Sequence, residues 1–381
     1  MERIVVVMPA WNEEENIRGM IKELVDKEFP KIPAEMHLLV VDNHSKDRTE
    51  EIVEKASKTR SNVHIIQQGA KSGLGWAYIN GFKYAVDKLH ADAVIEMDAD
   101  FQHPPRFVRP MVEAYLNGAD YVIGSRYIPD GSVPAEWEFF RKFISFAGNL
   151  FIRVVLLKPK IHDLTTGFRL TRVKGVLEKI DLDNLMEPHR FAHKVDLMYQ
   201  AIKNSKKVVE IPLKFAARTK EKSKFNTKEM VATFKVAIIL GIKDKAKFIK
   251  FGTVGFIGYL VNASTLWLFT QWRWPGSLAW GVSTELAILN NFVFNNIWTF
   301  RSEKITGLSN LVKKFLQFNL TSAGALIIQV VFGNLSDFLF GVQYRQLALP
   351  FIIVFLVLPY NYFMYNAVIW KSWNLAKIFK K

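Results

Sequence analysis

The stretch Glu96-Met-Asp98-Ala-Asp100-Phe-Gln102-His-Pro-Pro105 follows directly on the apolar run Ala93-Val-Ile95. The run is typical of a buried strand, and carboxylates at the end of such a strand are costly unless a cation neutralises them. Asp98 and Asp100 lie two positions apart, so on an extended segment both side chains point to the same side. Carboxylate oxygens placed in this way suit Mg²⁺ or Mn²⁺ carrying a diphosphate. The alternative is a polar strand end that caps the next helix.

Strand-like and helix-like segments alternate around this stretch. Strands are predicted at Ile4–Ala10, His37–Asp42, Val63–Gln67, Ala93–Met97 and Tyr121–Ile123, and helices at Asn16–Phe29, Thr49–Ser57, Gly73–Leu89 and Phe107–Asn117. This α/β alternation predicts a mainly parallel sheet with helices on both faces. Ligands bind beyond the carboxyl ends of the strands in such sheets. Pro9–Glu13, Asp42 and Asp98–Gln102 all fall at such ends, so we expect them to line one crevice.

The composition changes after about residue 247. Two long stretches, residues 251–300 and 315–370, contain only four charged residues, Arg273, Glu285, Asp337 and Arg345. Apolar stretches of this length are typical of membrane spans. We predict an α-helical transmembrane bundle of four helices, near residues 248–271, 278–300, 315–340 and 348–370. Core helices of a large soluble protein are the alternative, but no amphipathic segment remains to cover them.

The net charge of +15 is concentrated around these apolar stretches. Residues 241–381 contain 14 Lys/Arg against 4 Asp/Glu, so the excess predicts no nucleic-acid partner. Basic residues gather before the first predicted span, between the second and third, and after the fourth. The positive-inside rule then places residues 1–247, the middle loop and the C-terminus in the cytoplasm. The chain has no cysteine, which excludes disulfides and thiolate metal ligands.

A candidate amphipathic helix covers about residues 137–157. Polar residues recur at every fourth position from Arg141 to Arg153, and phenylalanine and leucine residues surround this stripe. Such a helix is typical of one that lies in the membrane interface, with its polar stripe toward the lipid headgroups. Residues 226–243 are a second candidate of the same kind. Ordinary packing on the sheet or on the membrane helices is the alternative.

Several short motifs occur within the first 225 residues. They are Met8–Glu13, Val41-Asp42, Gly73-Leu-Gly75 with Gly81, Asp98–Pro105, Gly124–Tyr127, Asp163–Arg169, and Glu210–Phe215 with Arg218 and Ser223-Lys224. Together they resemble the motifs of the polyprenyl-phosphate glycosyltransferases, and most closely those of the dolichyl-phosphate mannose synthases. Trp11, Asn43 and Arg48 depart from the Tyr, Asp and Gly usual in that family. Residues 248–370, with Asn290-Asn-Phe292 and Trp298-Thr-Phe300, resemble the GtrA-like four-helix domain fused to some of these enzymes.

The resemblance implies a division of the chain and a reaction. Residues 1–225 would form a GT-A nucleotide-sugar-binding domain, 226–247 an interfacial helix and linker, 248–371 a GtrA-like transmembrane domain and 372–381 a basic cytoplasmic tail. The reaction would be an inverting transfer of mannose from GDP-mannose to dolichyl or another polyprenyl phosphate at the cytoplasmic face of the cell membrane. The residues alone leave UDP-glucose open as donor. They also leave open a lipid-sugar translocator whose cytosolic domain only binds nucleotide sugar.

The resemblance also assigns roles to residues. Asp98, Asp100 and Gln102 would hold Mg²⁺ or Mn²⁺, and Asp100, Arg126 and Arg218 would act at the reaction itself. The donor nucleotide would contact Pro9, Ala10, Trp11, Glu13, Asp42, Lys71, Asp98, Ala99, Arg218 and Lys224.

The acceptor should need no general base, because a phosphate monoester is already anionic near neutral pH. Its site should instead be cationic. Arg126, Arg141 and Ser145 are the candidates, and Asp163–Arg169 would shape the site around them.

Two further segments have a functional and a purely structural interpretation. Lys71-Ser-Gly-Leu-Gly75 is either a phosphate-binding loop or a tight turn before a helix. The segment from Arg218 to Lys224 either closes over the phosphates of the donor or forms a solvated basic loop.

Overall fold

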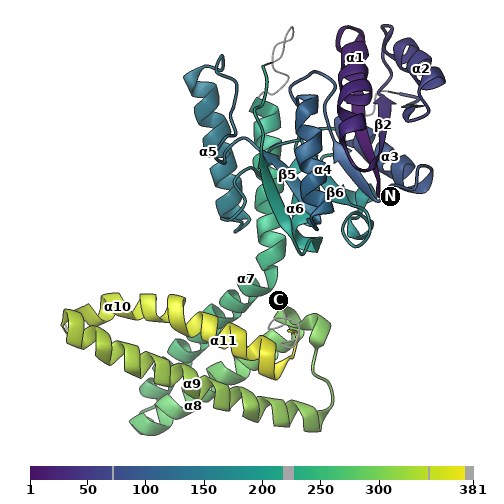
Figure 1. Cartoon of the computed structure of the whole chain (residues 1–381). Helices are drawn as coiled ribbons and strands as arrows, with labels where there is room; N and C mark the ends of the chain where they lie inside the picture. Colours follow the sequence, from purple (N-terminus) through teal and green to yellow (C-terminus); the bar gives the residue numbers. More distant parts are fainter. Residues whose placement is uncertain (71–72, 218–226, 342–343, 374–381) are drawn as a thin grey trace. The chain divides into compact units, whose positions relative to one another are not determined.

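The computed structural model of the chain describes residues 1–70, 73–217, 227–341 and 344–373 (Figure 1). The chain forms two compact units, residues 1–241 and residues 242–381. The α7 helix, Thr227–Gln271, begins in the first unit and continues into the second. Each unit has its own architecture.

A seven-stranded sheet forms the centre of the first unit, with strand order β3-β2-β1-β4-β6-β5-β7 (Figure 1). The strands are β1 Arg3–Ala10, β2 Glu35–Asp42, β3 Val63–Gln67, β4 Ala93–Glu96, β5 Tyr121–Ser125, β6 Arg169–Arg172 and β7 Val208–Pro212. Every neighbouring pair is parallel except the two pairs that contain β6, which runs antiparallel to β4 and β5. The predicted mainly parallel sheet is confirmed, whereas β6 and β7 are missing from the predicted strands.

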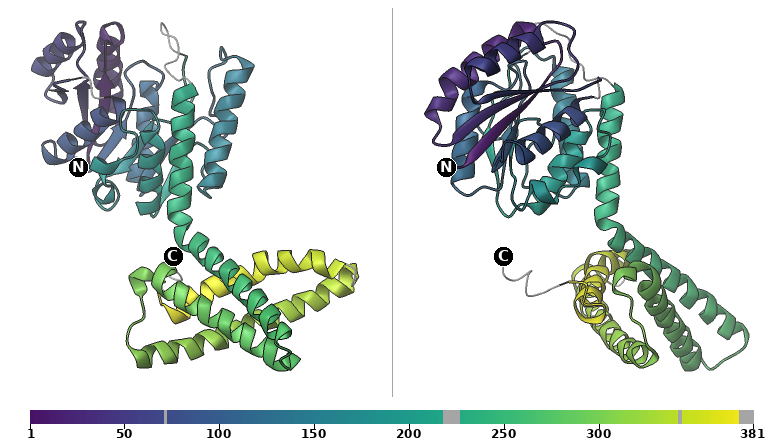
Figure 2. Two further views of the ribbon diagram at one scale, coloured as in Figure 1. Left: turned by 180° about the vertical axis from the view of Figure 1, so that it is seen from behind. Right: turned by 90° about the vertical axis from the view of Figure 1, so that its right-hand side faces the viewer.

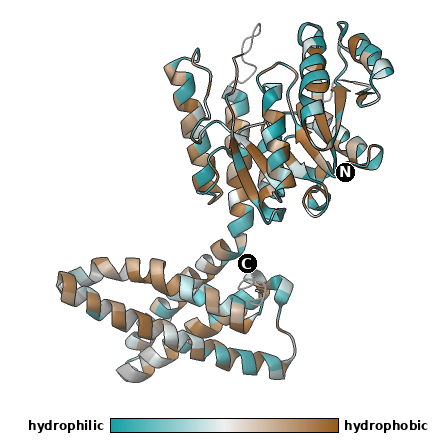
Figure 3. Ribbon diagram, in the orientation of Figure 1, coloured by the Kyte–Doolittle hydropathy of each residue, from teal (hydrophilic) through white to brown (hydrophobic). Residues whose placement is uncertain are grey.

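Helices cover both faces of this sheet (Figure 2). They are α1 Glu14–Ile21, α2 Thr49–Thr59, α3 Leu74–Asp87, α4 Val108–Leu116, α5 Phe139–Val155 and α6 His193–Asn204. Alternate residues of a strand point to opposite faces, and β1 accordingly supplies two cores. Ile4, Val6 and Met8 pack with α1, α2 and α4, whereas Val5 and Val7 pack with α3, α5 and α6. Hydrophobic residues are therefore concentrated in the strands (Figure 3).

The carboxyl ends of the first strands meet at one edge of the sheet, as predicted. The paired residues there are Ala10 with Asp42, Asp42 with Gln67, and Val7 with Glu96. The loops after β1 and β2 are also joined to each other. Asn12 donates its backbone N–H to Ser45 Oγ at 3.0 Å, and its Oδ1 accepts the N–H of Lys46 at 2.8 Å. These two hydrogen bonds hold the loop after β1 against the loop after β2, at the same edge of the sheet as the end of β4.

The second unit is helical. After α7 it contains α8 Gly276–Phe294, η6 Asn295–Thr299, α9 Leu308–Phe340, α10 Arg345–Ile352, η9 Ile353–Val357, α11 Leu358–Met364 and η10 Tyr365–Ile369. Its core is aromatic, and Phe300 stacks on Trp370 with ring centroids 4.3 Å apart. Among the described residues, α7 is the helix that is long and apolar enough to cross a membrane, judged by length and composition. A bundle of four spans stays a prediction.

Candidate active site

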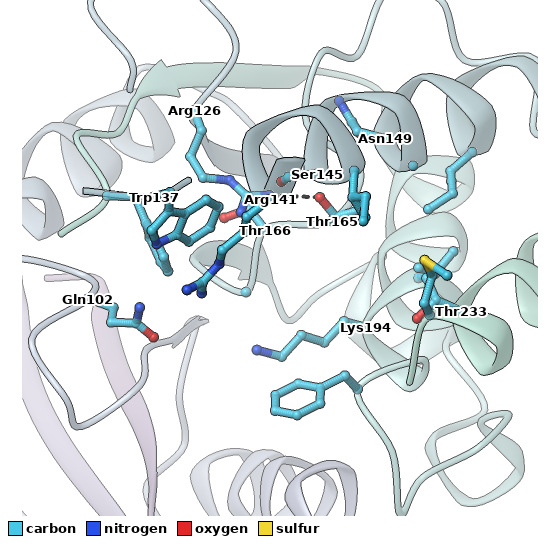
Figure 4. Close-up of a pocket in the computed structure, with 18 of the residues that line it drawn as sticks. Gln102, Arg126, Trp137, Arg141, Ser145, Asn149, Thr165, Thr166, Lys194 and Thr233 are labelled. Carbon is cyan, nitrogen blue, oxygen red and sulfur yellow. Dashed lines mark hydrogen bonds between the residues drawn. The ribbon is translucent and has the colours of Figure 1, made fainter. Parts of the chain in front are cut away.

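A cavity of about 690 Å³ lies beside the carboxyl end of β4, within the first unit (Figure 4). Its lining includes Asp98 and Gln102 after β4, Arg126 after β5, Arg141 and Ser145 on α5, Thr165–Gly167 before β6, Lys194 on α6, and Thr227, Met230, Thr233 and Phe234 in the first turns of α7. The fold thus brings the acidic end of β4 and the three candidate acceptor residues, Arg126, Arg141 and Ser145, into one space.

Asp98 is held in the cavity wall by its neighbours. The hydroxyl of Tyr78 donates to Asp98 Oδ1 at 3.0 Å, and the backbone N–H of Asp98 donates to Nδ1 of His103 at 3.0 Å. Burial lowers the pKa of His103 to about 4, so its ring is neutral near pH 7 and Nδ1 can accept that bond. His103 therefore orients Asp98 and is unsuited to act as a general base near neutral pH.

The turn after Asp98 has an unusual backbone. Phe101 adopts a φ of 61°, in the left-handed region that bulky residues rarely occupy. Within this turn Oδ1 of Asp100 accepts the backbone N–H of Gln102 at 3.1 Å. The carbonyl of Gln102 in turn accepts the N–H of Ala216 at 3.1 Å, which joins the turn to the segment after β7. Local strain of this kind is concentrated at functional sites.

The oxygen atoms at this turn fit a divalent metal. Asp98 and Asp100 offer carboxylate oxygens and Gln102 an amide oxygen, which are the hard donors that Mg²⁺ and Mn²⁺ accept. Within the described part of the chain, no group of three or more His, Cys, Asp or Glu side chains could hold a metal ion.

Arg126 reaches the cavity as half of a buried ion pair. Its Nε and Nη2 lie 2.7 and 2.9 Å from the two carboxylate oxygens of Asp163, and Nη2 also donates to Thr165 Oγ1 at 2.7 Å. Burial acts to raise the pKa of Asp163, but Arg126 and backbone N–H groups outweigh burial and hold that pKa below its usual value. Glu210 fixes the loop by accepting the N–H of Asp163 at 3.0 Å. The charge of Arg126 is thus largely offset before any ligand binds.

The polar stripe of α5 contributes Arg141, Ser145 and Asn149 to the wall of the cavity, and its predicted position at the lipid headgroups stays a prediction. Ser145 shares a 2.6 Å hydrogen bond with Tyr127, Asn149 is 2% exposed, and the guanidinium of Arg141 lies 4.0 Å from the ring centroid of Trp137. Apart from Arg141, the exposed residues of α5 are apolar: Phe139, Phe140, Phe143, Phe146, Leu150, Phe151 and Val154. Exposure falls along the stripe, from the exposed Arg141 through the half-buried Ser145 to the buried Asn149.

The predicted donor residues lie at the strand ends on the other side of Asp98. Asp42 is 2% exposed, and its Oδ2 accepts the N–H of Ser45 at 3.0 Å. Oδ1 of Asp42 is buried and has no hydrogen-bond partner among the described residues, as expected of an acceptor that awaits a ligand. Three of the residues predicted to contact the donor nucleotide, Lys71, Arg218 and Lys224, lie outside the described residues.

The glycines of the Lys71–Gly75 segment serve close packing. Gly73 has a φ of 99°, and a Cβ there would lie 2.9 Å from Cα of His189. A Cβ on Gly75 would lie 2.4 Å from the carbonyl oxygen of Pro188. Both glycines therefore let the loop before α6 approach the first turn of α3, which supports the interpretation as a tight turn.

Sequence reasoning misses Lys194. This residue is 8% exposed, and its Nζ lies 3.7 Å from Oδ2 of Asp98. A lysine at the start of an amphipathic helix usually indicates a solvated surface. Its burial depends on Gly167 and Arg169, which come from a distant segment, so no local signal in the sequence indicates it.

His193 gives a pH-dependent prediction. Its Nδ1 lies 2.6 Å from the carbonyl oxygen of Arg190, and its buried Nε2 has no hydrogen-bond partner in the described ranges. Burial lowers its pKa to about 3, whereas in the unfolded chain it takes up a proton near pH 6.5. Acid therefore favours unfolding, and the native state should lose about 1.5 kcal/mol from this group between pH 6.5 and pH 5.

His193→Asn should remove this part of the pH dependence while it keeps a donor to the carbonyl of Arg190. Thermal unfolding of both proteins at a series of pH values in detergent measures the difference. Other histidines titrate equally in the two proteins and cancel. Identical pH profiles would show that His193 accepts a proton in the native state.

Comparisons with known proteins identify the family of both parts of the chain. Residues 5–178 match the model of the glycosyl transferase family 2, and residues 250–370 match the GtrA/DPMS transmembrane domain. Dolichol-phosphate mannosyltransferase from Pyrococcus furiosus is 32% identical over 90% of this chain and 92% of its own length. Polyprenol monophosphomannose synthase from Mycolicibacterium smegmatis is 36% identical over 65% of this chain and 91% of its own length. Among solved structures, glucosyl-3-phosphoglycerate synthase from Mycobacterium tuberculosis matches 64% of this chain and 79% of its own, with 17% identity and a TM-score of 0.42.

Proposed function

The chain belongs to the polyprenyl-phosphate glycosyltransferases, and from this premise we propose that it transfers mannose from GDP-mannose to dolichyl or another polyprenyl phosphate. The products would be the β-linked lipid sugar and GDP, formed by a single in-line displacement. The proposal draws on two relatives whose names specify lipid-phosphate mannosyl transfer. The choice of GDP-mannose over UDP-glucose belongs to this proposal.

The observation that carries the proposal is the shared cavity. Asp98 and Gln102 on one side and Arg141 and Ser145 on the other line the same space. A donor diphosphate at the first pair and an acceptor phosphate at the second would therefore lie next to each other. Holding two reactants in this way lowers the entropic part of the barrier.

The side chains around the cavity would have two separate roles, metal binding and acceptor binding. Asp98, Asp100 and Gln102 would hold a divalent metal, which supplies positive charge to the leaving diphosphate. Arg141 would bind the acceptor phosphate, and Ser145 would donate to one of its oxygens. Because the acceptor is already an anion, no side chain has to remove a proton from it.

Product analysis with a panel of substrates tests the proposal. The purified full chain in detergent is incubated with polyprenyl phosphate and labelled GDP-mannose, UDP-glucose or GDP-glucose. We expect label in the lipid fraction with GDP-mannose, and no transfer to the unphosphorylated polyprenol. Preference for UDP-glucose would overturn the donor, and donor binding without transfer would favour the translocator.

The chain is a membrane protein, and we propose that it crosses the bilayer four times with the first unit in the cytoplasm. Because the chain has no cysteine, single cysteines report topology cleanly. Trp272→Cys lies between α7 and α8, and Thr306→Cys lies between η6 and α9. An impermeant thiol reagent should label these two variants from opposite sides of sealed vesicles.

Lys174→Cys, at an exposed site of the first unit, serves as the matched control. It should be labelled from the same side as Thr306→Cys. Labelling of Trp272→Cys and Thr306→Cys from one side would contradict a span between them.

A further inference from the structure

Lys194 is a nearly buried cation between the two halves of the cavity. Its Nζ lies 3.7 Å from Oδ2 of Asp98, beyond hydrogen-bond distance, and 5.5 Å from the ring centroid of Phe191. In Figure 4 its side chain and that of Arg141 converge on the space beside Gln102. An ammonium carries three N–H donors, so Lys194 can serve a ligand in this space.

The surrounding chain is built to hold this side chain in place. The carbonyl of Lys194 accepts a 2.7 Å hydrogen bond from Nη1 of Arg169, which is fully buried and paired with Glu96. Gly167 leaves room for the end of the side chain, because a Cβ there would lie 2.3 Å from Nζ of Lys194 and 3.2 Å from Cε. A side chain at position 167 would therefore displace the ammonium.

The balance of charge around the cavity shows what Lys194 can bind. Arg126 is largely offset by Asp163, and Glu136 and Glu138 are exposed. Among the described residues, the other cations that line the cavity are Arg141 and Lys194, and Asp98 lies 3.7 Å from the Nζ of Lys194. A phosphate monoester carries about 1.5 to 2 negative charges near pH 7, so a single arginine leaves it incompletely compensated.

We propose that Lys194 is a second cationic ligand of the acceptor phosphate, opposite Arg141, and that Gly167 is required to place it. The inference rests on the proposed function, since it names a further residue of the same acceptor site. The low exposure of Lys194 strengthens its attraction for an anion, because fewer water molecules screen it.

Direct binding of a short, soluble prenyl phosphate to the full chain in detergent tests this role. Lys194→Met keeps the length of the side chain and removes the charge, whereas Gly167→Ala keeps the charge and displaces it. Each should raise the Kd of the prenyl phosphate about tenfold to a hundredfold, as expected for one charged hydrogen bond. The double variant should bind no more weakly than Lys194→Met, because both changes remove the same contact.

Controls separate this role from a structural one. Lys203→Met, at an exposed site on the same helix, should leave the Kd unchanged, and Arg141→Met should raise it as Lys194→Met does. The KM for the sugar nucleotide should stay within about twofold in every variant with the native unfolding temperature. An unchanged Kd for the prenyl phosphate, additive effects in the double variant, or a larger effect on the donor would each overturn the proposal.

The proposed function can fail separately. If the wild-type chain binds prenyl phosphate but transfers no mannose to it, the reaction is wrong while the acceptor site still stands. If the wild type transfers mannose and Lys194→Met binds the acceptor normally, the reaction stands and the role of Lys194 is wrong.

Discussion

Asp100→Asn should reduce sugar transfer about a thousandfold, near 4 kcal/mol of transition-state stabilisation. The substitution keeps the shape of the side chain and an oxygen that can accept the N–H of Gln102, a bond of 3.1 Å in the native turn. It removes the negative charge that a divalent cation needs. The loss should therefore fall on metal-dependent transfer, measured as kcat/KM across a titration of Mg²⁺ and Mn²⁺.

Asp183→Asn is the matched control. Asp183 is an exposed carboxylate paired with Lys83, so its loss should change turnover little. Thermal unfolding of both variants should resemble that of the wild type. Normal turnover of Asp100→Asn, with its metal requirement retained, would refute the assignment of Asp100 as a metal ligand.

Arg169→Met should destabilise the first unit by about 3 to 5 kcal/mol, because it leaves Glu96 buried without a cation. Arg169 is fully buried, Glu96 is 1% exposed, and the two residues pair directly across β6 and β4. In a unit of this size the loss corresponds to a fall of roughly 10 °C in Tm. Thermal unfolding in detergent, followed by circular dichroism, measures it.

Two further variants isolate the cause. Arg172→Met lies on the same strand and breaks a more exposed pair with Asp120, so it should cost at most about 1 kcal/mol. The double variant Glu96→Met/Arg169→Met should regain most of the lost stability, because no buried charge remains. A double variant as unstable as Arg169→Met would show that Arg169 stabilises the fold through its other contacts.

The first half of the sheet could be predicted because its signal is local. The run from Ile4 to Met8 is apolar at every position since both faces of β1 are covered, and such runs are visible in the sequence. The chain continues from β1, β2 and β4 directly into polar loops, so the position of the site followed from the strand ends. The contribution of the α5 stripe to the cavity wall could not be predicted from the sequence, because it depends on which distant loops pack against α5.

The strand β6 could not be predicted because its stability depends on a distant partner. Its sequence, Arg169-Leu-Thr-Arg172, shows no apolar run, and Arg169 is buried only through Glu96, which lies 73 positions earlier. Lys194 was missed for the same reason. The burial of Lys194 depends on Gly167 and on Arg169. Because β6 was not predicted, neither the Arg169–Glu96 ion pair nor the burial of Lys194 could be predicted.

The outward phenylalanines of α5 affect how the first unit can be handled in the laboratory. Phe139 is 84% exposed and Phe140 is 68% exposed, and both belong to residues 1–241 rather than to the apolar second unit. Deleting the second unit would therefore still leave a surface-active protein that adsorbs to air–water interfaces and self-associates in plain buffer. Replacing Phe139 and Phe143 by polar residues offers a route to a soluble fragment, since both are exposed and neither lines the cavity, whereas Phe140 does.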